Sequence, residues 1–318
     1  MARQVELTIG VDVGGTKIAA GVVDPAGTVI DEVRVSTPAT TAEAVETGIV
    51  TAVEQLAGKH TVEAVGIAIA GFVDESRATL RFAPNLPMEE RPLQELLARA
   101  TGLRSVVEND ANAAAWGEFR FGGGRGSKDM VLLTVGTGLG GGIVLDDRLL
   151  RGAFGSAGEV GHVRMVPDGL ACGCGNRGCW EQYSSGSALI REARALARSR
   201  PERAARLLDL AEGDAEAISG RMVTQAAAEG DPTALGLLAE VGRWLGEGIA
   251  DLADILDPAA VVVGGGVSEA GDLLLQPARE AYEALLSAGG HRPHLKIVAA
   301  ELGNAAGLVG AADLARHP

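Results

Sequence analysis

The chain has 318 residues, 47% of them hydrophobic and 22% charged, which is enough for two domains that each bury a core of their own. Lys and Arg number 28 against 42 Asp and Glu. The net charge of −14 would repel a phosphate backbone, which weighs against binding to nucleic acid or to an anionic membrane. The sequence has no run of about 18 apolar residues and starts without a signal-peptide pattern. We therefore expect a cytoplasmic protein that binds small molecules.

The first elements have the pattern of a β-hairpin tipped by glycines. Residues 5–11 alternate between hydrophobic and other residues and are rich in β-branched side chains. The motif Asp12-Val-Gly14-Gly15-Thr16-Lys17 follows and ends this pattern. A second strand is predicted over residues 18–23, before a turn at 24–27. Taken alone, this tip fits a tight turn as well as a cradle of backbone N–H groups for a phosphate.

Helices and strands then alternate, as in an α/β fold. Periodicity and end signals predict helices over 41–56, 93–101 and 111–119, and strands over 62–70 and 105–108. Asn109 and Asp110 stand where the last of these strands gives way to a helix, so either residue could simply cap that helix. The glycine-rich segment 121–127 follows a helix and not a strand, and we interpret it as a linker at a domain boundary.

The hairpin plan returns in the middle of the chain. A strand over 130–135, the glycine-rich turn 136–142 and a return strand over 143–145 form an internal repeat of the first hairpin. Gly136-x-Gly138-x-x-Gly141 also matches a dinucleotide fingerprint, with Glu159 near the distance of a ribose-binding acid. A dinucleotide-binding turn opens a helix, whereas here a strand follows, so we set that interpretation aside. The repeat predicts two related α/β domains that face each other with a phosphate cradle each.

The second half is predicted to be rich in helices. They extend over 187–256, with breaks near Gly213 and at 230–232, and are followed by strands over 259–263 and 295–299 and a terminal helix over 304–315. The first of these strands ends in Gly264-Gly265-Gly266-Val-Ser268. No Walker-type G-x-x-x-x-G-K-[ST] motif is present. Two cradles and a third glycine turn together favour nucleotide binding.

All three cysteines lie in one short stretch, Cys172-Gly-Cys174-Gly-Asn-Arg-Gly-Cys179, shortly after His162. An odd count at this spacing makes a disulfide framework a poor explanation, although three free thiols placed by chance are the simplest alternative. Three thiolates and one imidazole complete a tetrahedron around zinc and leave no position for water. The pattern therefore predicts one structural zinc ion, and any catalysis must come from other residues.

These motifs together resemble the ROK family of sugar kinases (repressor, open reading frame, kinase), within the actin-like ATPases, and most closely its bacterial ATP-dependent glucokinases. The resemblance covers nearly the whole chain, and its most specific part is Gly158-Glu159-Val-Gly161-His162 followed by the cysteine stretch and Trp180-Glu181. It implies a two-domain, actin-like (ribonuclease H-like) α/β fold with hexose bound between the domains. The small domain would comprise residues 1–117 and the C-terminal helix 302–318, and the large domain residues 118–301.

The resemblance also implies roles for individual residues. Asp110 would be the general base, and Asp12 would support the water shell of Mg-ATP. The sugar ligands would be Asn85, Asn109, Asp110, Glu159, His162 and Glu181. His162 would serve zinc through one ring nitrogen and sugar through the other, with Cys172, Cys174 and Cys179 as the remaining zinc ligands. The nucleotide would be bound by Asp12, Gly14, Gly15, Thr16, Lys17, Thr137, Gly138, Gly264, Gly265 and Gly266.

The expected reaction is transfer of the γ-phosphate of Mg-ATP to the 6-hydroxyl of glucose. Kinases for N-acetylmannosamine, N-acetylglucosamine, mannose or fructose remain open, because one wall of a pocket can change the hexose, and polyphosphate remains open as a donor. A sugar-sensing repressor of the same family would need an N-terminal helix-turn-helix, for which the early first hairpin leaves no room. A purely structural zinc protein would leave both cradles unused. The resemblance implies a dimer or tetramer.

Overall fold

The computed structural model describes residues 6–38 and 40–317. Val5, the first residue of the predicted opening strand, lies outside the described residues. The chain divides into two compact units, each described by itself below. The first comprises Met1–Leu132, Gly142–Gly158 and Ala300–Pro318, and the second comprises Leu133–Gly141 and Glu159–Ala299.

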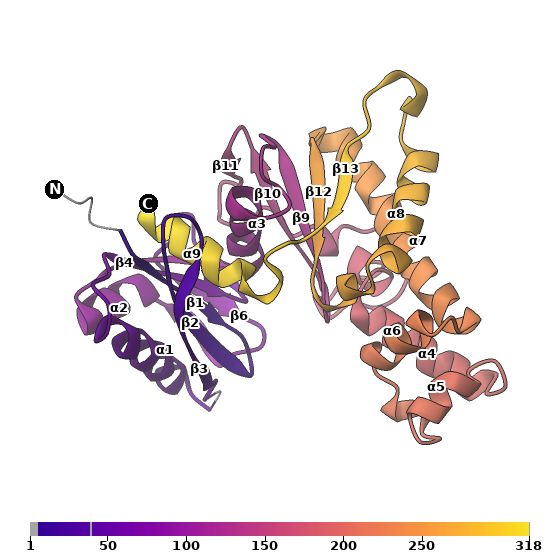
Figure 1. Cartoon of the computed structure of the whole chain (residues 1–318), viewed down its shortest axis with the longest axis horizontal. Helices are drawn as coiled ribbons and strands as arrows, with labels where there is room; N and C mark the ends of the chain where they lie inside the picture. Colours follow the sequence, from indigo (N-terminus) through magenta and orange to yellow (C-terminus); the bar gives the residue numbers. More distant parts are fainter. Residues whose placement is uncertain (1–5, 39, 318) are drawn as a thin grey trace. The chain divides into compact units, whose positions relative to one another are not determined.

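The first unit is built on a five-stranded sheet with the order β3-β2-β1-β4-β8 (Figure 1). Its strands are β1 (Thr8–Val13), β2 (Lys17–Val23), β3 (Val29–Ser36), β4 (Ala64–Ile69) and β8 (Arg104–Asn109). β1, β2 and β3 form an antiparallel meander, and β1, β4 and β8 run parallel. The predicted first hairpin is therefore confirmed as β1 and β2, and the carboxyl ends of β1 and β8 lie at the same edge of the sheet.

Helices cover both faces of this sheet. α1 (Ala42–Ala57) and α2 (Leu93–Thr101) pack on one face, where Ile9, Val11 and Val13 of β1 belong to the main core. α9 (Ala306–Arg316) and α3 (Asp110–Phe121) pack on the other face. Because strand side chains alternate, the remaining positions of β1, among them Asp12, point toward the α9 face.

On the α9 face of the sheet, glycines allow the backbone of α9 to approach the strands closely. A methyl group at Gly10 of β1 would overlap the carbonyl oxygen of Leu308, and one at Gly66 of β4 would overlap that of Ala311. Gly310 of α9 lies equally close to the carbonyl oxygen of Ala113 in α3. Glycine at these positions lets α9 lie directly on the strands, where Figure 1 shows it beside β1 and β2.

A small antiparallel sheet, absent from the sequence prediction, completes the first unit. It has the order β5-β6-β7, with β5 (Phe72–Val73), β6 (Leu80–Ala83) and β7 (Met88–Arg91). Its strands have two to four residues, too few for a period-two pattern to stand out from the surrounding loop. β3, which alternates between half-buried and exposed positions at the sheet edge, was also missed.

A second five-stranded sheet has the order β11-β10-β9-β12-β13. Its strands are β9 (Met130–Val135), β10 (Leu139–Leu145), β11 (Arg148–Leu149), β12 (Ala260–Gly264) and β13 (Lys296–Ala299). The repeat of the hairpin is confirmed, but β10 begins four residues earlier than predicted. Gly140, Gly141 and Gly142 are therefore strand residues and not part of the turn. At Gly142 a side chain would run into Ala115 and the backbone of α3, so this glycine serves packing.

The helices of the second unit are α4 (Gly186–Ser199), α5 (Ala205–Leu210), α6 (Gly220–Ala228), α7 (Pro232–Leu256) and α8 (Asp272–Leu285). The predicted break at 230–232 is confirmed, because Asp231 caps α7 and Pro232 is its first residue. α8 was not predicted. It packs along α7, where Gly242 and Gly246 bring the two backbones together.

The segment interpreted as a linker, 121–127, forms hydrogen-bonded turns within the first unit. Glu118 explains this arrangement. Its carboxylate is fully buried and accepts hydrogen bonds from the backbone N–H groups of Gly123, Glu301 and Leu302. One carboxylate thus ties the end of α3 to the segment that enters α9.

Within the described part of the chain, no helix has the length and apolar character needed to span a membrane.

Candidate active site and metal centre

The first predicted phosphate motif forms the tip of the β1–β2 hairpin. The Gly14 N–H donates to the carbonyl oxygen of Lys17 at 3.0 Å, which closes the turn. The Thr37 hydroxyl donates to the carbonyl oxygen of Gly14 at 2.7 Å and holds the turn from outside. Gly15, Thr16 and Lys17 are exposed at the tip. The tip is thus a rigid turn with accessible backbone, the geometry that a phosphate cradle requires.

Asn109 and Asp110 have separate positions at the β8–α3 junction. Asn109 is the N-cap of α3, and its side chain accepts a hydrogen bond from the Asn112 N–H at 3.0 Å. Its amide nitrogen also donates to the carbonyl oxygen of Gly71 at 3.1 Å. Asp110 is the first residue of the helix itself. The capping role that the sequence left open for either residue therefore belongs to Asn109, which leaves the Asp110 carboxyl available for another role.

Asp12 and Asp110 form an electrostatically strained pair in the first unit. The pKa of Asp12 is raised to about 6, chiefly by burial and next by the negative charge of Asp110, while Lys17 opposes the shift. Burial also raises the pKa of Asp110, although the hydrogen bond from the Ala111 N–H lowers this pKa in part. Two carboxylates that are costly to ionise side by side favour a proton or a cation between them.

Asn85 lies beside the hairpin tip. A side chain at Gly15 would come within 3.4 Å of the Asn85 carbonyl oxygen and 3.6 Å of its Cβ. The first unit therefore contains the predicted sugar ligands Asn85, Asn109 and Asp110 and the predicted magnesium-supporting residue Asp12, which lie near strand ends, in a turn or at the start of α3.

The four predicted zinc ligands come together in the second unit. Their ligand atoms all lie within 4.8 Å of one another. The distance is 3.7 Å from His162 Nδ1 to Cys172 Sγ and 3.6 Å from Cys174 Sγ to Cys179 Sγ. Tetrahedral ligands about 2.3 Å from zinc stand roughly 3.8 Å apart, whereas a disulfide would need about 2.05 Å between sulfurs. The donor set and its spacing fit a structural zinc ion.

The loop that carries the cysteines is shaped by glycines and anchored by a tryptophan. Gly175 and Gly178 adopt positive φ of 91° and 77°, whereas Gly173, between the first two cysteines, does not. Trp180 is buried and its Nε1 donates to the Trp244 carbonyl oxygen at 2.8 Å. The metal loop is thereby fixed to α7.

The pKa values of two of the thiols indicate that a bound cation would be needed to keep them ionised. Burial, and after it the hydrogen bond to Glu181, raise the pKa of the Cys172 thiol to about 12. Burial raises the pKa of Cys179 in the same way. Such thiols stay protonated at neutral pH unless a cation stabilises the thiolates.

The predicted sugar ligands of this unit surround His162. Glu181 Oε1 lies 3.8 Å from His162 Nδ1, and Glu159 Oε2 lies 3.9 Å from His162 Nε2. Nδ1 thus faces the cysteines and Nε2 faces Glu159, consistent with a ring that serves the metal through one nitrogen and another ligand through the other. Gly138 adjoins this group, because a side chain there would come within 2.7 Å of Glu181 Oε2.

The remaining nucleotide motifs line a cavity of about 500 Å³ in the second unit. Gly136 and Thr137 border it from the β9–β10 turn, and Gly266 and Val267 from the turn after β12. Gly265 has φ of 86° and packs against the backbone of Val135, which holds the two turns together. A cavity of this size suits a nucleoside.

The sequence predicted helices over 187–256 but did not indicate that the starts of two of them complete this cavity. Its further lining residues are Gly186, Ser187, Leu189 and Ile190 from the start of α4, Ser219, Gly220, Arg221 and Thr224 from α6, and Glu269. The only local signal was a Ser-Gly pair at each helix start, where Ser185 and Ser219 act as N-caps. Such pairs mark a helix end and do not say what the end faces.

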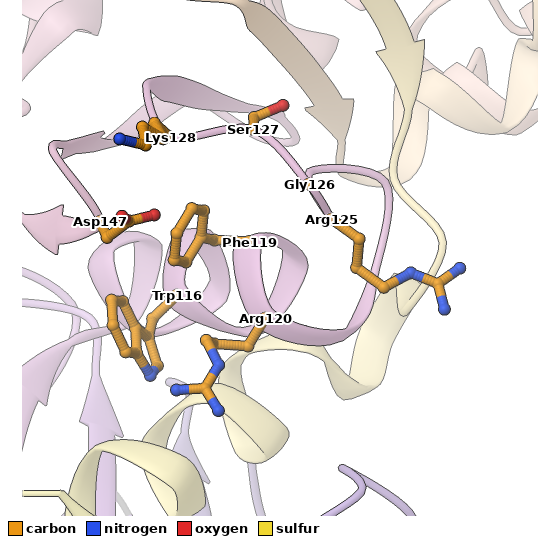
Figure 2. Close-up of a pocket in the computed structure, with 8 residues that line it drawn as sticks. All are labelled: Trp116, Phe119, Arg120, Arg125, Gly126, Ser127, Lys128 and Asp147. Carbon is orange, nitrogen blue, oxygen red and sulfur yellow. The ribbon is translucent and has the colours of Figure 1, made fainter.

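A separate hollow of about 590 Å³ lies in the first unit and is lined by none of the predicted residues (Figure 2). Its two arginines already form ion pairs: Arg120 contacts Asp313 at 3.4 Å, and Arg125 contacts Glu301 at 2.9 Å. Trp116 Nε1 donates to the same Asp313 at 2.9 Å. These contacts hold the end of α3 to the α9 segment.

Nearly the whole chain is similar to known proteins of one family. A model of the ROK family matches residues 8–317. The glucokinase of Streptomyces coelicolor is 54% identical over 312 residues, which covers 98% of this chain and 98% of that protein. The solved structure of a ROK family glucokinase from Streptomyces griseus, in complex with glucose and AMPPNP, is 54% identical with a TM-score of 0.89 and covers 98% of this chain and 100% of that one.

A ROK hexokinase structure from Thermus thermophilus is 38% identical with a TM-score of 0.81, and the match covers 98% of each chain. These likenesses confirm the predicted α/β, actin-like fold class with its two mixed five-stranded sheets. Since both the family model and the relatives span nearly the full sequence, the chain belongs to the ROK family.

Proposed function

We propose that this protein is an ATP-dependent glucokinase, which transfers the γ-phosphate of Mg-ATP to the 6-hydroxyl of glucose. The observation that carries the proposal is the likeness to the Streptomyces griseus glucokinase, whose structure holds glucose and an ATP analogue and matches this chain at 54% identity. The motif residues of this chain support it, because each unit contains a glycine turn next to acidic side chains.

In the proposed reaction, Asp110 accepts the proton of the 6-hydroxyl as this oxygen attacks the γ-phosphate. Its position at the first residue of α3, with the cap supplied by Asn109, supports this role. A carboxyl whose pKa is raised by burial holds a proton more readily than an exposed one, which suits a general base. Asp12 would orient water molecules around the magnesium that accompanies ATP and offsets the charge of its phosphates.

The proposed hexose ligands are Asn85, Asn109, Asp110, Glu159, His162 and Glu181. This set mixes acceptors with donors, as a polyol requires. His162 would reach the sugar through Nε2 while Nδ1 binds the zinc together with Cys172, Cys174 and Cys179. The zinc would hold this loop in place.

The nucleotide would use the two glycine turns and the cavity of the second unit. Backbone N–H groups at Gly15, Thr137 and Gly138 would bind phosphates, with Gly14 closing the first turn and Thr16 and Lys17 beside it. The adenosine would occupy the 500 Å³ cavity next to Gly264, Gly265 and Gly266.

The test is a panel of glucose, mannose, fructose, N-acetylglucosamine and N-acetylmannosamine, each with ATP or polyphosphate, with release of ADP or of sugar phosphate as the readout. We expect turnover that requires magnesium, with the highest kcat/KM for glucose and ATP. A higher kcat/KM for an acetylated amino sugar or for fructose would leave a kinase with another substrate. Sugar binding without turnover would indicate a sensor.

A further inference from the structure

Glu108 is a buried carboxylate directly before Asn109 and Asp110. It is 3% exposed and lies at the end of β8. Its Oε2 accepts a hydrogen bond from Arg151 Nε at 2.8 Å, forms an ion pair with a terminal nitrogen of Arg151 at 2.8 Å, and lies 3.5 Å from Arg77 Nε. Its Oε1 accepts from the Asn109 N–H at 3.3 Å and from Asn112 Nδ2 at 3.2 Å. One side chain therefore contacts four neighbours.

Every group around Glu108 is a donor. An ionised carboxylate has acceptors on both oxygens, whereas the amide of a glutamine would turn an NH₂ group toward one set of donors. Arg77 Nε and Asn112 Oδ1 are buried without a hydrogen-bond partner among the described residues, so the network is incompletely satisfied even with glutamate. Glutamine would keep the size of the side chain but lose the charge that faces both arginines.

The Oε1 side of this network holds the start of α3. Glu108 fixes the Asn109 N–H, while the Asn109 side chain caps the helix and reaches the carbonyl oxygen of Gly71. Asp110 is the next residue, so the direction of its side chain depends on this turn. Glu108 and Asn112 together clamp the turn from the buried side.

The Oε2 side holds a second segment, residues 151–158. Arg151 begins it, and the Arg151 carbonyl oxygen accepts a hydrogen bond from the Ala157 N–H at 3.0 Å. At Gly155, φ is 79° and a side chain would overlap the carbonyl oxygen of Val73, so the segment lies tightly on β5. In the sequence this segment leads straight into Glu159.

We infer that Glu108 and Arg151 are positioning residues for phosphoryl transfer: one buried carboxylate joins the turn that carries Asp110 to the segment that leads to Glu159. The inference rests on the proposed function, because it assigns Asp110 and Glu159 their roles. Small displacements of a catalytic group cost rate steeply, up to about 100-fold for roughly 1 Å. Loss of the Glu108 charge should therefore lower kcat beyond what a loss of stability explains.

The same unit offers a matched control. Glu46 of α1 is 5% exposed and accepts two hydrogen bonds from Arg91 of β7, from Nε at 2.6 Å and from a terminal nitrogen at 3.0 Å. This pair is also a buried carboxylate with a forked arginine, but neither element carries a predicted site residue. Glu46→Gln should lose stability as Glu108→Gln does, without a change in the geometry of Asp110.

The experiment compares kcat, KM and melting temperature of the wild type, Glu108→Gln and Glu46→Gln. Turnover of glucose and ATP by the wild type comes first, since its absence would refute the proposed function and not the positioning role. We expect both variants to melt lower than the wild type, kcat to fall about 10- to 100-fold in Glu108→Gln only, and KM for ATP to stay within about two-fold in both. Equal kcat values in the two variants would overturn the inference.

Arg151 provides a second test if Glu108→Gln does not fold. Arg77 remains beside Glu108 in Arg151→Met, so we expect this variant to fold with a lower melting temperature and to lower kcat in the same direction. Arg151→Lys keeps the charge but loses the fork and should recover part of that loss. A third readout is the combination with Asp110→Asn: if Arg151 acts through Asp110, adding Arg151→Met should change the residual turnover little. A full additional loss, or wild-type kcat in Arg151→Met, would contradict the positioning role.

Discussion

Replacement of Asp12 by asparagine should make the protein more stable at neutral pH and less active. The pKa of Asp12 is raised from 3.8 to about 6, first by burial and then by Asp110. The folded state therefore binds this proton more tightly than the unfolded state. The stabilisation is fully present below pH 3.8 and is lost as the pH rises through about 6.

The magnitude follows from the shift. At 1.36 kcal/mol per pKa unit, ionised Asp12 costs at most about 3 kcal/mol of folding free energy at pH 7. Asparagine has the same size and no charge, so it removes this cost. At about 2 °C per kcal/mol for a chain of this length, the melting temperature should rise by up to about 6 °C.

The assay is thermal or urea unfolding of wild type and Asp12→Asn without ligands, at pH 7.5 and at pH 4. The difference should be largest at pH 7.5 and should nearly vanish at pH 4, where the wild-type carboxyl is protonated. Magnesium should stabilise the wild type more than the variant, because only the wild type offers a carboxylate. A variant that is less stable than the wild type at pH 7.5, or a difference that does not depend on pH, would refute the reasoning.

Three further outcomes are expected. Asp110→Asn should fold and bind glucose but lose about 10² to 10⁴ in kcat, because Asn109 and not Asp110 caps α3; an active variant in the hexose assay would remove Asp110 as the base. Cys174→Ser should lose the zinc by metal analysis, lower the melting temperature and raise KM for glucose, and retention of zinc with an unchanged KM would argue against the coupling through His162. Gly310→Ala should lower the free energy of unfolding in urea by about 1 to 3 kcal/mol, because its methyl group would overlap the Ala113 carbonyl oxygen. Gly236→Ala, on an open face of α7, should instead raise the free energy of unfolding by about 0.5 to 1 kcal/mol. Equal effects of the two substitutions would show that α9 has room to shift.

Local patterns predicted the features whose determinants are close in the sequence. The β1–β2 hairpin, the β9–β10 hairpin and the metal ligands each depend on residues within about twenty positions of one another, and their chemistry is visible in the residue types. The helix breaks at Pro232 and the αL cap at Gly102 follow for the same reason.

Features that depend on distant segments could not be predicted in this way. The glycines at 140–142 looked like part of a phosphate turn, but Gly142 is required by the approach of α3 to β10. The helix starts that line the 500 Å³ cavity carry ordinary capping serines. Glu108 looked like the last residue of a short strand, since its arginine partners lie about 30 residues before it and 43 residues after it.

The place of α9 in the fold has a consequence for synthesis on the ribosome. β1 leaves the ribosome about 290 residues before α9, which at roughly 5 to 20 residues per second is a delay of about 15 to 60 s. During that time the face of β1 and β4 that bears Gly10 and Gly66 lacks α9, the helix that covers most of it, although α3 has already been made. We expect the nascent first unit to be more accessible to chaperones and proteases until α9 docks. A premature stop just before residue 306 should yield a polypeptide that is degraded more readily than the full chain, even though every residue proposed for catalysis has been made.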